Sequence, residues 1–259
     1  MKTYDDIQVE GHLRVLIWAP PGSGKTALAA TFPGTAFIDF DNGLKVLKSK
    51  WFKQWNRGKP GLVGYETFDD KYDSRGIFLK AQGLWDAIKF INRVADDPQV
   101  KTIVVDSLTS FQTLAMHAGT EAAGNVSPKP RSNTLANARG NVKALLYTQA
   151  DFGAEMGIFE QFMNQFIGIE KNLVCIAHER EVISSSGGVQ RREPYLIGSS
   201  IRAQVAKWFD EVWYLDVDSK GKRRLITEYS GLMKVNKSRL GVPNKLEDPN
   251  YKKILQEIS

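Results

Sequence analysis

The octet Ala19-Pro20-Pro21-Gly22-Ser23-Gly24-Lys25-Thr26 decides the fold of this 259-residue chain. It follows the apolar run 13–18 and leads into the apolar residues 27–30, so the pattern predicts a strand, a glycine-rich turn and a helix. Glycines let successive backbone N–H groups turn toward one anion. The order of these elements therefore predicts a loop that binds the phosphates of a nucleoside triphosphate.

Each side chain of this loop has an expected role. Lys25 would reach the β- and γ-phosphates, and the Thr26 hydroxyl would bind Mg²⁺. The first motif position holds Ala19 where glycine is usual, and a residue this small still clears the turn. ATP and Mg²⁺ are the expected cofactors, and the residues expected to bind the nucleotide are Pro21, Gly22, Ser23, Gly24, Lys25, Thr26 and Ala27.

Polar side chains at the ends of further apolar runs can complete such a site. Asp106 ends the β-branched run 102–105, where a carboxylate can hold Mg²⁺, usually through water. Asp39 and Asp41 lie at the end of the predicted strand 36–40, and one of them is suited to activate the attacking water. His178 follows the run 173–177 and is placed to polarise the γ-phosphate. The alternatives are a helix N-cap for Asp106 and a hydrogen-bonded strand-end histidine for His178.

The order of the elements predicts an α/β fold. Strands expected at 13–18, 36–40, 102–105 and 173–177 alternate with helices at 25–31, 77–94 and about 135–169. Short strands at 211–217, 225–228 and 232–235 follow, so a mostly parallel sheet flanked by helices ends in a β-rich hairpin region. We expect one domain over 1–259, with a nucleotide-binding core over 13–217, a hairpin over 218–241 and a tail over 242–259.

The net charge of +6 is unevenly distributed. Residues 42–65 and 122–150 contain no acid, and this clustering favours a polyanion such as single-stranded DNA, although a solvated basic face is the alternative. Trp51, Phe52 and Trp55 alternate with lysines, which suits base stacking but also the packing of a small amphipathic helix. The clustered cations are Lys45, Lys48, Lys50, Lys53, Arg57, Lys59, Lys129, Arg131, Arg139, Lys143, Lys220, Lys222, Arg223, Arg224, Lys234, Lys237 and Arg239.

Two motifs resemble those of RecA-like P-loop ATPases. Phe37-Ile38-Asp39-Phe40-Asp41 is similar to the second strand of that family, and Val104-Val105-Asp106-Ser107 to its Walker B strand. The resemblance covers residues 13–241. It implies that Asp41 is the catalytic base, where RecA itself has Glu. It also puts His178 at the sensor position that couples ATP to a DNA-binding loop, here matched in position by 184–192.

Lys237-Ser238-Arg239 is similar to the Lys-x-Arg pair of the RadA, KaiC and DnaB branch. In that branch both cations reach the γ-phosphate bound by a neighbouring subunit. The resemblance implies a homo-oligomer, ring or filament, in which Lys237 and Arg239 act in trans and hydrolysis depends on assembly. A plain basic hairpin is the alternative.

The signature Asp39-Phe40-Asp41-Asn42-Gly43, together with His178-Glu179, resembles phage-encoded Sak-four-type proteins. That resemblance implies an ATPase that binds single-stranded DNA and supports annealing or recombination, with a single-strand-binding protein as a further partner. A nucleotide-gated assembly module with little turnover and a P-loop kinase for a small metabolite are the alternatives.

The chain is expected to work in the cytoplasm of a bacterial host and away from membranes. It contains no run of 18 apolar residues, and its first ten residues are polar, unlike a signal peptide. Its one cysteine, Cys175, excludes an internal disulfide and fits a reducing compartment.

Overall fold

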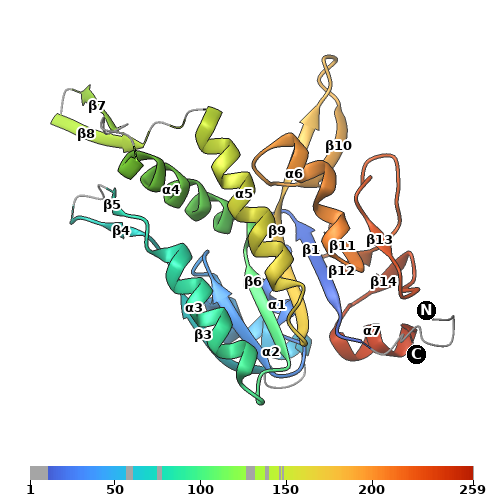
Figure 1. Ribbon diagram of the computed structural model, residues 1–259. Coiled ribbons are helices and arrows are strands. Elements are labelled where there is room, and N and C mark those ends of the chain that lie inside the picture. The colour runs from blue at the N-terminus through green and yellow to red at the C-terminus, as the bar shows by residue number, and fades with distance from the viewer. Residues whose placement is uncertain are drawn as a thin grey trace, which may run out of the picture.

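The computed structural model describes residues 11–56, 61–74, 78–126, 132–137, 140–145, 147 and 149–258. Ten strands form one sheet: β1 (Arg14–Ala19), β2 (Thr35–Asp39), β3 (Leu62–Thr67), β6 (Thr102–Asp106), β9 (Asn172–Ile183), β10 (Val189–Pro194), β11 (Glu211–Val217), β12 (Arg223–Ile226), β13 (Lys237–Ser238) and β14 (Lys245–Glu247). Their order is β14-β12-β11-β1-β9-β6-β2-β3, with β10 paired to β9 and β13 to β11 (Figure 1). The strands from β11 to β3 in this order run parallel, and the others pair antiparallel. The predicted α/β class, with a mostly parallel sheet and antiparallel C-terminal strands, is confirmed.

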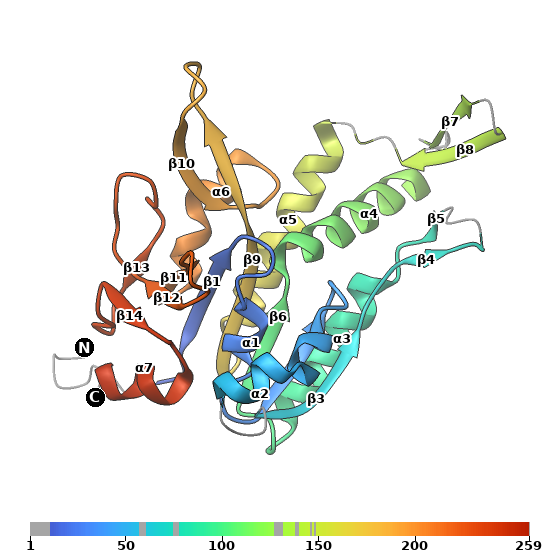
Figure 2. The ribbon, with the colours of Figure 1, turned by 180° about the vertical axis from the view of Figure 1, so that it is seen from behind.

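Helices cover both faces of the sheet, as parallel strands require. The helices are α1 (Lys25–Ala29), α2 (Lys50–Asn56), α3 (Gly83–Asp96), α4 (Leu108–Val126), α5 (Gln149–Phe166), α6 (Ser199–Gln204) and α7 (Tyr251–Ile258), with 3₁₀ turns at Leu44–Lys48 and Val205–Trp208. Helices α3, α4 and α5 lie on one face, and α1 and α2 lie on the other (Figures 1 and 2). Two small hairpins, β4 (Lys71–Tyr72) with β5 (Phe78–Lys80) and β7 (Ser132–Asn137) with β8 (Gly140–Leu145), lie outside the sheet.

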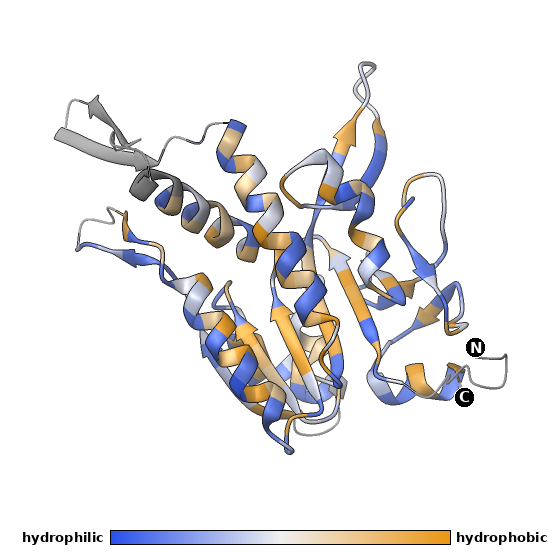
Figure 3. Ribbon diagram, viewed as in Figure 1, coloured by the Kyte–Doolittle hydropathy of each residue, from blue (hydrophilic) through white to orange (hydrophobic). Residues whose placement is uncertain are grey.

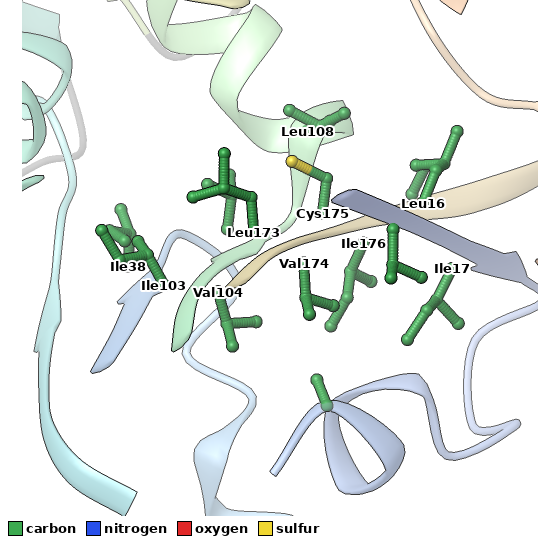
Figure 4. Packing of buried hydrophobic residues seen from close by; sticks show 14 of the residues in the cluster. Leu16, Ile17, Ile38, Ile103, Val104, Leu108, Leu173, Val174, Cys175 and Ile176 are labelled. Atoms are coloured by element: carbon green, nitrogen blue, oxygen red, sulfur yellow. The ribbon is translucent and has the colours of Figure 1, made fainter. Parts of the chain in front are cut away.

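The central strands are the apolar runs of the sequence. Every residue of β2 and β6 is buried, and the central strands of the sheet are coloured mainly as hydrophobic (Figure 3). Leu16, Val104 and Cys175 come from three neighbouring strands and pack in this core (Figure 4). Burial raises the pKa of the Cys175 thiol well above its ordinary value, so this cysteine serves as core packing.

Two predicted elements are wrong, and the helix predicted over 77–94 begins only at Gly83, after the strand β5. The stretch 232–235 is not a strand: Ser230 and Met233 close a turn, and the Leu232 carbonyl accepts a hydrogen bond from the Arg192 N–H. The strand comes later, as β13 at Lys237–Ser238, because the Glu211 carboxylate accepts hydrogen bonds from this segment. The helix predicted to begin near residue 135 begins at Gln149 instead. Residues 132–145 contain good helix formers, but propensity is a weak influence beside the β7–β8 ladder.

The C-terminal strands continue the main sheet. β14 lies within the predicted tail 242–259 and pairs with β12, so the strands of that tail and of the segment 218–241 belong to one sheet. The part of the chain that is described contains no helix with the length and hydrophobicity that a membrane crossing needs.

Candidate nucleotide site

The carboxyl ends of four parallel strands meet at one edge of the sheet, and the predicted site residues lie there. Ala19, the last residue of β1, pairs with His178 of β9. Asp39 at the end of β2 pairs with Asp106 at the end of β6. Ligands bind at this edge in open α/β sheets. The register therefore brings together residues that are up to 159 positions apart, 19 and 178.

The loop between β1 and α1 has the backbone that its glycines predict. Gly22 and Gly24 have φ angles of 79° and 104°, in the left-handed region that favours glycine. The space where a side chain of Gly22 would begin is open, with nothing within 4 Å. The Ser23 hydroxyl is buried and has no hydrogen-bond partner among the described residues. A bound phosphate would satisfy such a group, so the loop fits an oxyanion.

Lys25 lies under this loop. Its Nζ donates hydrogen bonds of 2.9 Å to the Ala19 and Pro20 carbonyls. Burial lowers the pKa of Lys25 to about 8, although the carboxylates of Asp106, Asp41 and Glu179 act to raise it. Because burial outweighs these carboxylates, a further anion beside Nζ would stabilise the charged amine.

Thr26 and Asp106 join the P-loop to the Walker B strand. The Thr26 hydroxyl donates a hydrogen bond of 2.6 Å to Asp106 Oδ2. Burial raises the pKa of Asp106 to about 7, and the nearby carboxylates of Asp41 and Asp39 add to this, whereas the Thr26 bond and Lys25 lower it. A divalent cation prefers oxygen ligands of these two kinds and would ionise the Asp106 carboxyl. The pair therefore fits Mg²⁺, held directly or through water.

Asp41 lies beside His178 and Ser110. Its Oδ2 lies 3.0 Å from His178 Nε2, its Oδ1 accepts a hydrogen bond from the Ser110 hydroxyl, and its side chain is 23% exposed. Burial acts to raise the pKa of Asp41, but hydrogen bonds from His178, Ser110 and Ser107 outweigh it, so the pKa is lowered. The pKa values of Asp41 and Asp106 are thus shifted in opposite directions, which is typical of paired groups with different roles.

Asp39 has a different position. Its Oδ1 accepts 3.2 Å hydrogen bonds from the backbone N–H groups of Asp41 and Gly43. These bonds shape the turn after β2, in which Asn42 has a φ of 53°. Asp39 therefore orients the segment that carries Asp41, and of the two acids only Asp41 lines the cavity.

A cavity of about 290 Å³ contains most of the predicted residues. The expected residues that line it are Pro21, Gly22, Gly24, Lys25, Thr26, Asp41, Asp106 and His178. Ala27 is buried in α1 behind the loop. Gly43, Val46, Trp51 and Arg223 also line the cavity, and motif reasoning assigned them no part in the nucleotide site. The sequence offers only general signals for these residues: Trp51 lies where aromatic residues alternate with lysines, and Arg223 lies among the cations at 220–224.

Lys237 and Arg239 lie away from this cavity. β13 pairs with the start of β11, at Glu211 and Val212, whereas the P-loop follows the end of the parallel strand β1. Arg239 is 59% exposed in its side chain and pairs with Asp210 at 3.1 Å. Burial and the neighbouring Arg239 lower the pKa of Lys237. The chain's own cavity thus lacks these two cations, and their role in trans stays a prediction.

The basic and aromatic clusters are only partly described. Phe52 is fully buried in the core, as its packing alternative expects, whereas Trp51 stacks on Trp55 with ring centres 5.6 Å apart. The predicted cations that lie outside the described residues are Arg57, Lys59, Lys129, Arg131 and Arg139, and no side chain is described for Lys143.

A family model described as an AAA domain matches residues 12–240, which is most of the chain and includes every residue of the cavity. No curated protein matches.

Proposed function

Because the chain belongs to the AAA domain family of P-loop ATPases, we propose that it binds ATP with Mg²⁺ and hydrolyses the nucleotide. The observation that carries the proposal is the 2.6 Å contact between Thr26 and Asp106, in a cavity that also contains Lys25 and the Asp41–His178 pair. Nucleotide binding needs only Lys25 and the Thr26–Asp106 pair. Hydrolysis also needs a group that orients water, and the Asp41–His178 pair supplies one.

Each residue has a task in this reaction. When bound, the Mg²⁺–ATP complex supplies the phosphoryl group to be transferred and a cation that neutralises its oxygens. Lys25 binds the terminal phosphates, and Thr26 with Asp106 provides the oxygen ligands for the cation. The Asp41 carboxylate would orient a water molecule and accept its proton on one of its oxygens as the water attacks the terminal phosphate. His178 Nε2 fixes the Asp41 carboxylate in that position.

Substitution of Lys25 tests the site. We expect Lys25→Ala to lose at least 10-fold in ATP affinity and to lose hydrolysis, with the unfolding midpoint retained, because the amine is the cation of the phosphate cradle. Lys101→Ala is the matched control, since Lys101 is exposed beside the amino end of β6. Measured ATP binding and phosphate release that are unchanged in Lys25→Ala would refute the assignment.

We propose that the polyanion partner is single-stranded DNA, consistent with the net charge of +6. β9 supports this. Its first half contains His178 and pairs with β1 and β6, and its second half forms a hairpin with β10 that projects from the molecule (Figure 1). Arg180 and Arg191 are exposed on this hairpin. One strand therefore connects the side chain that contacts Asp41 with a projecting hairpin that presents exposed arginines.

A salt series tests DNA binding. For single strands the logarithm of affinity falls with the logarithm of salt concentration by about 0.7 per phosphate contact. The double variant Arg180→Ala/Arg191→Ala is expected to reduce that slope by about 1.4, and Arg93→Ala on α3 is the control. Binding to an oligonucleotide that does not change with salt would contradict the proposal.

We propose further that a second copy of the chain completes the site through Lys237 and Arg239. The distance of these cations from their own cavity supports a role in trans. Variants of either residue should keep ATP affinity and lose turnover. Mixing such a variant with Lys25→Ala protein should restore part of the turnover, because each protein keeps the residues that the other lacks. The proposal would be contradicted if ATP turnover per chain did not depend on protein concentration and the protein ran as a monomer on a sizing column with ATP. Assembly with little turnover would instead favour a nucleotide-gated assembly module.

The role in annealing or recombination, with a phage origin, is the biological setting that we propose for this activity. Annealing of complementary strands, measured with and without ATP, is its direct test.

A further inference from the structure

A cation outside the predicted motif lies against the P-loop. Arg223 of β12 is half-buried. Its Nε donates a 2.9 Å hydrogen bond to the Ser23 carbonyl, 200 positions earlier in the sequence. It lines the same cavity as Lys25 and Thr26. Arg223 therefore reaches the loop from its own chain, whereas Lys237 and Arg239 do not.

The charge of Arg223 has no carboxylate partner among the described residues. Its Nε and Nη1 donate to neutral carbonyls, those of Ser23 and Gly221. Burial lowers the pKa of Arg223, and Asp248 offsets this only in part. By contrast, the adjacent Arg224 is paired with Asp216. A guanidinium has five N–H donors, so donors remain for an anion in the cavity.

Trp51 fixes the orientation of this guanidinium. The Arg223 Cζ lies 3.8 Å from the centre of the Trp51 ring, and that ring stacks on Trp55 at an interplanar angle of 12°. Stacking occupies one face of the guanidinium and leaves its edge free for hydrogen bonds. At Gly24 a Cβ atom would lie 2.7 Å from Arg223 Nε, so the absence of a side chain there permits the close approach.

We propose that Arg223 is a further phosphate-binding residue of the nucleotide site, supplied in cis and held by Trp51 as its positioning residue. The inference rests on the proposed nucleotide site and adds to it. Arg223 binds the phosphate chain beside Gly24, on the cavity wall formed by Trp51. An arginine fork suits phosphate oxygens better than a lysine does.

Binding of ATP, ADP and adenosine, each with Mg²⁺, tests the proposal in the full chain. Arg223→Gln should lower the affinity for ATP and ADP about 10- to 100-fold, because a charge-assisted bond to phosphate is lost. The affinity for adenosine should stay within 2-fold of the wild type. Arg223→Lys should recover part of the affinity. Arg224→Gln is the matched control, since its partner Asp216 lies outside the cavity.

Substitution of Trp51 tests the positioning role. Trp51→Leu should lower the affinity for ATP by less than Arg223→Gln does. Trp51→Phe should restore this affinity, because a phenyl ring can still stack on the guanidinium. Equal losses of adenosine and ATP in Trp51→Leu would overturn this role and assign Trp51 to the base instead.

The two proposals fail in different ways. If Lys25→Ala loses ATP but Arg223→Gln binds it within 2-fold of the wild type, only the role of Arg223 is wrong. If Lys25→Ala keeps its ATP affinity, the nucleotide site itself is wrong. Unfolding midpoints of both variants exclude loss of fold as the cause.

Discussion

Replacing Asp106 with asparagine should stabilise the protein in the absence of nucleotide and Mg²⁺, increasingly so as the pH rises. Asparagine keeps an oxygen that can accept the Thr26 hydrogen bond, and it cannot ionise. Burial raises the pKa of Asp106 from 3.8 to about 7. The folded protein therefore binds a proton that the unfolded chain has already lost, so the stability of the wild type falls as the pH rises between these values.

The size of the effect follows from the difference in pKa. A shift of about 3 units corresponds to about 4 kcal/mol once both states are ionised, at pH 8. The difference between Asp106→Asn and the wild type should be near zero below about pH 3 and about 2 kcal/mol at pH 5. Since domains are stable by only about 5–15 kcal/mol, the upper value is a large fraction of the total.

Urea unfolding at pH 5, 6, 7 and 8 measures this difference. Asp218→Asn is the control, because hydrogen bonds from the backbone N–H of Lys222 and Lys220 lower the pKa of that exposed carboxyl below 3.8. It is ionised in both the folded and the unfolded state from pH 5 to 8, so its difference from the wild type should not change over this range. The reasoning would be refuted if the difference in unfolding free energy between Asp106→Asn and the wild type did not change with pH. It would also be refuted if the variant were less stable than the wild type at pH 8. With ATP and Mg²⁺ present, the wild type should gain more stability than the variant.

Three more substitutions have defined outcomes. Asp41→Asn should keep ATP affinity and lower single-turnover hydrolysis about 10²- to 10⁴-fold, since the amide cannot accept the proton; hydrolysis within 10-fold of the wild type would exclude Asp41 as the base. Gln112→Leu should cost about 1–3 kcal/mol in urea unfolding, because it leaves the buried Glu155 carboxyl without its 2.7 Å hydrogen bond; a neutral effect would show that the bond contributes little. Glu211→Gln should cost a similar amount, because the buried carboxylate accepts four hydrogen bonds, and a stability equal to the wild type would contradict this.

The parts of the fold that were predictable depend on local patterns. The P-loop octet, the β-branched run that ends at Asp106 and the apolar run before His178 each reveal their element within a few residues. Parallel strands then require the ends of these elements to meet at one edge, so the Thr26–Asp106 contact follows from the fold class.

The parts that were missed depend on contacts between distant segments. Arg223 belongs to the site because β12 pairs with β11 beside β1, and no local pattern distinguishes it from Arg224, which pairs with Asp216. The strand expected at 232–235 forms instead at Lys237–Ser238, where the buried carboxylate of Glu211 binds the backbone. Propensity alone could not show either preference.

The position of β1 has a consequence for protein synthesis. Its neighbours are β9 and β11, and its first pairs join residue 14 to residue 173 and residue 15 to residue 211. The apolar strand leaves the ribosome before its partners and stays unpaired until more than 150 further residues have been translated. Closing so long a loop costs entropy before pairing repays it. Nascent chains that end before β9 therefore cannot bring the P-loop beside Asp106 and His178, and they expose an apolar segment that chaperones would bind until β9 is made.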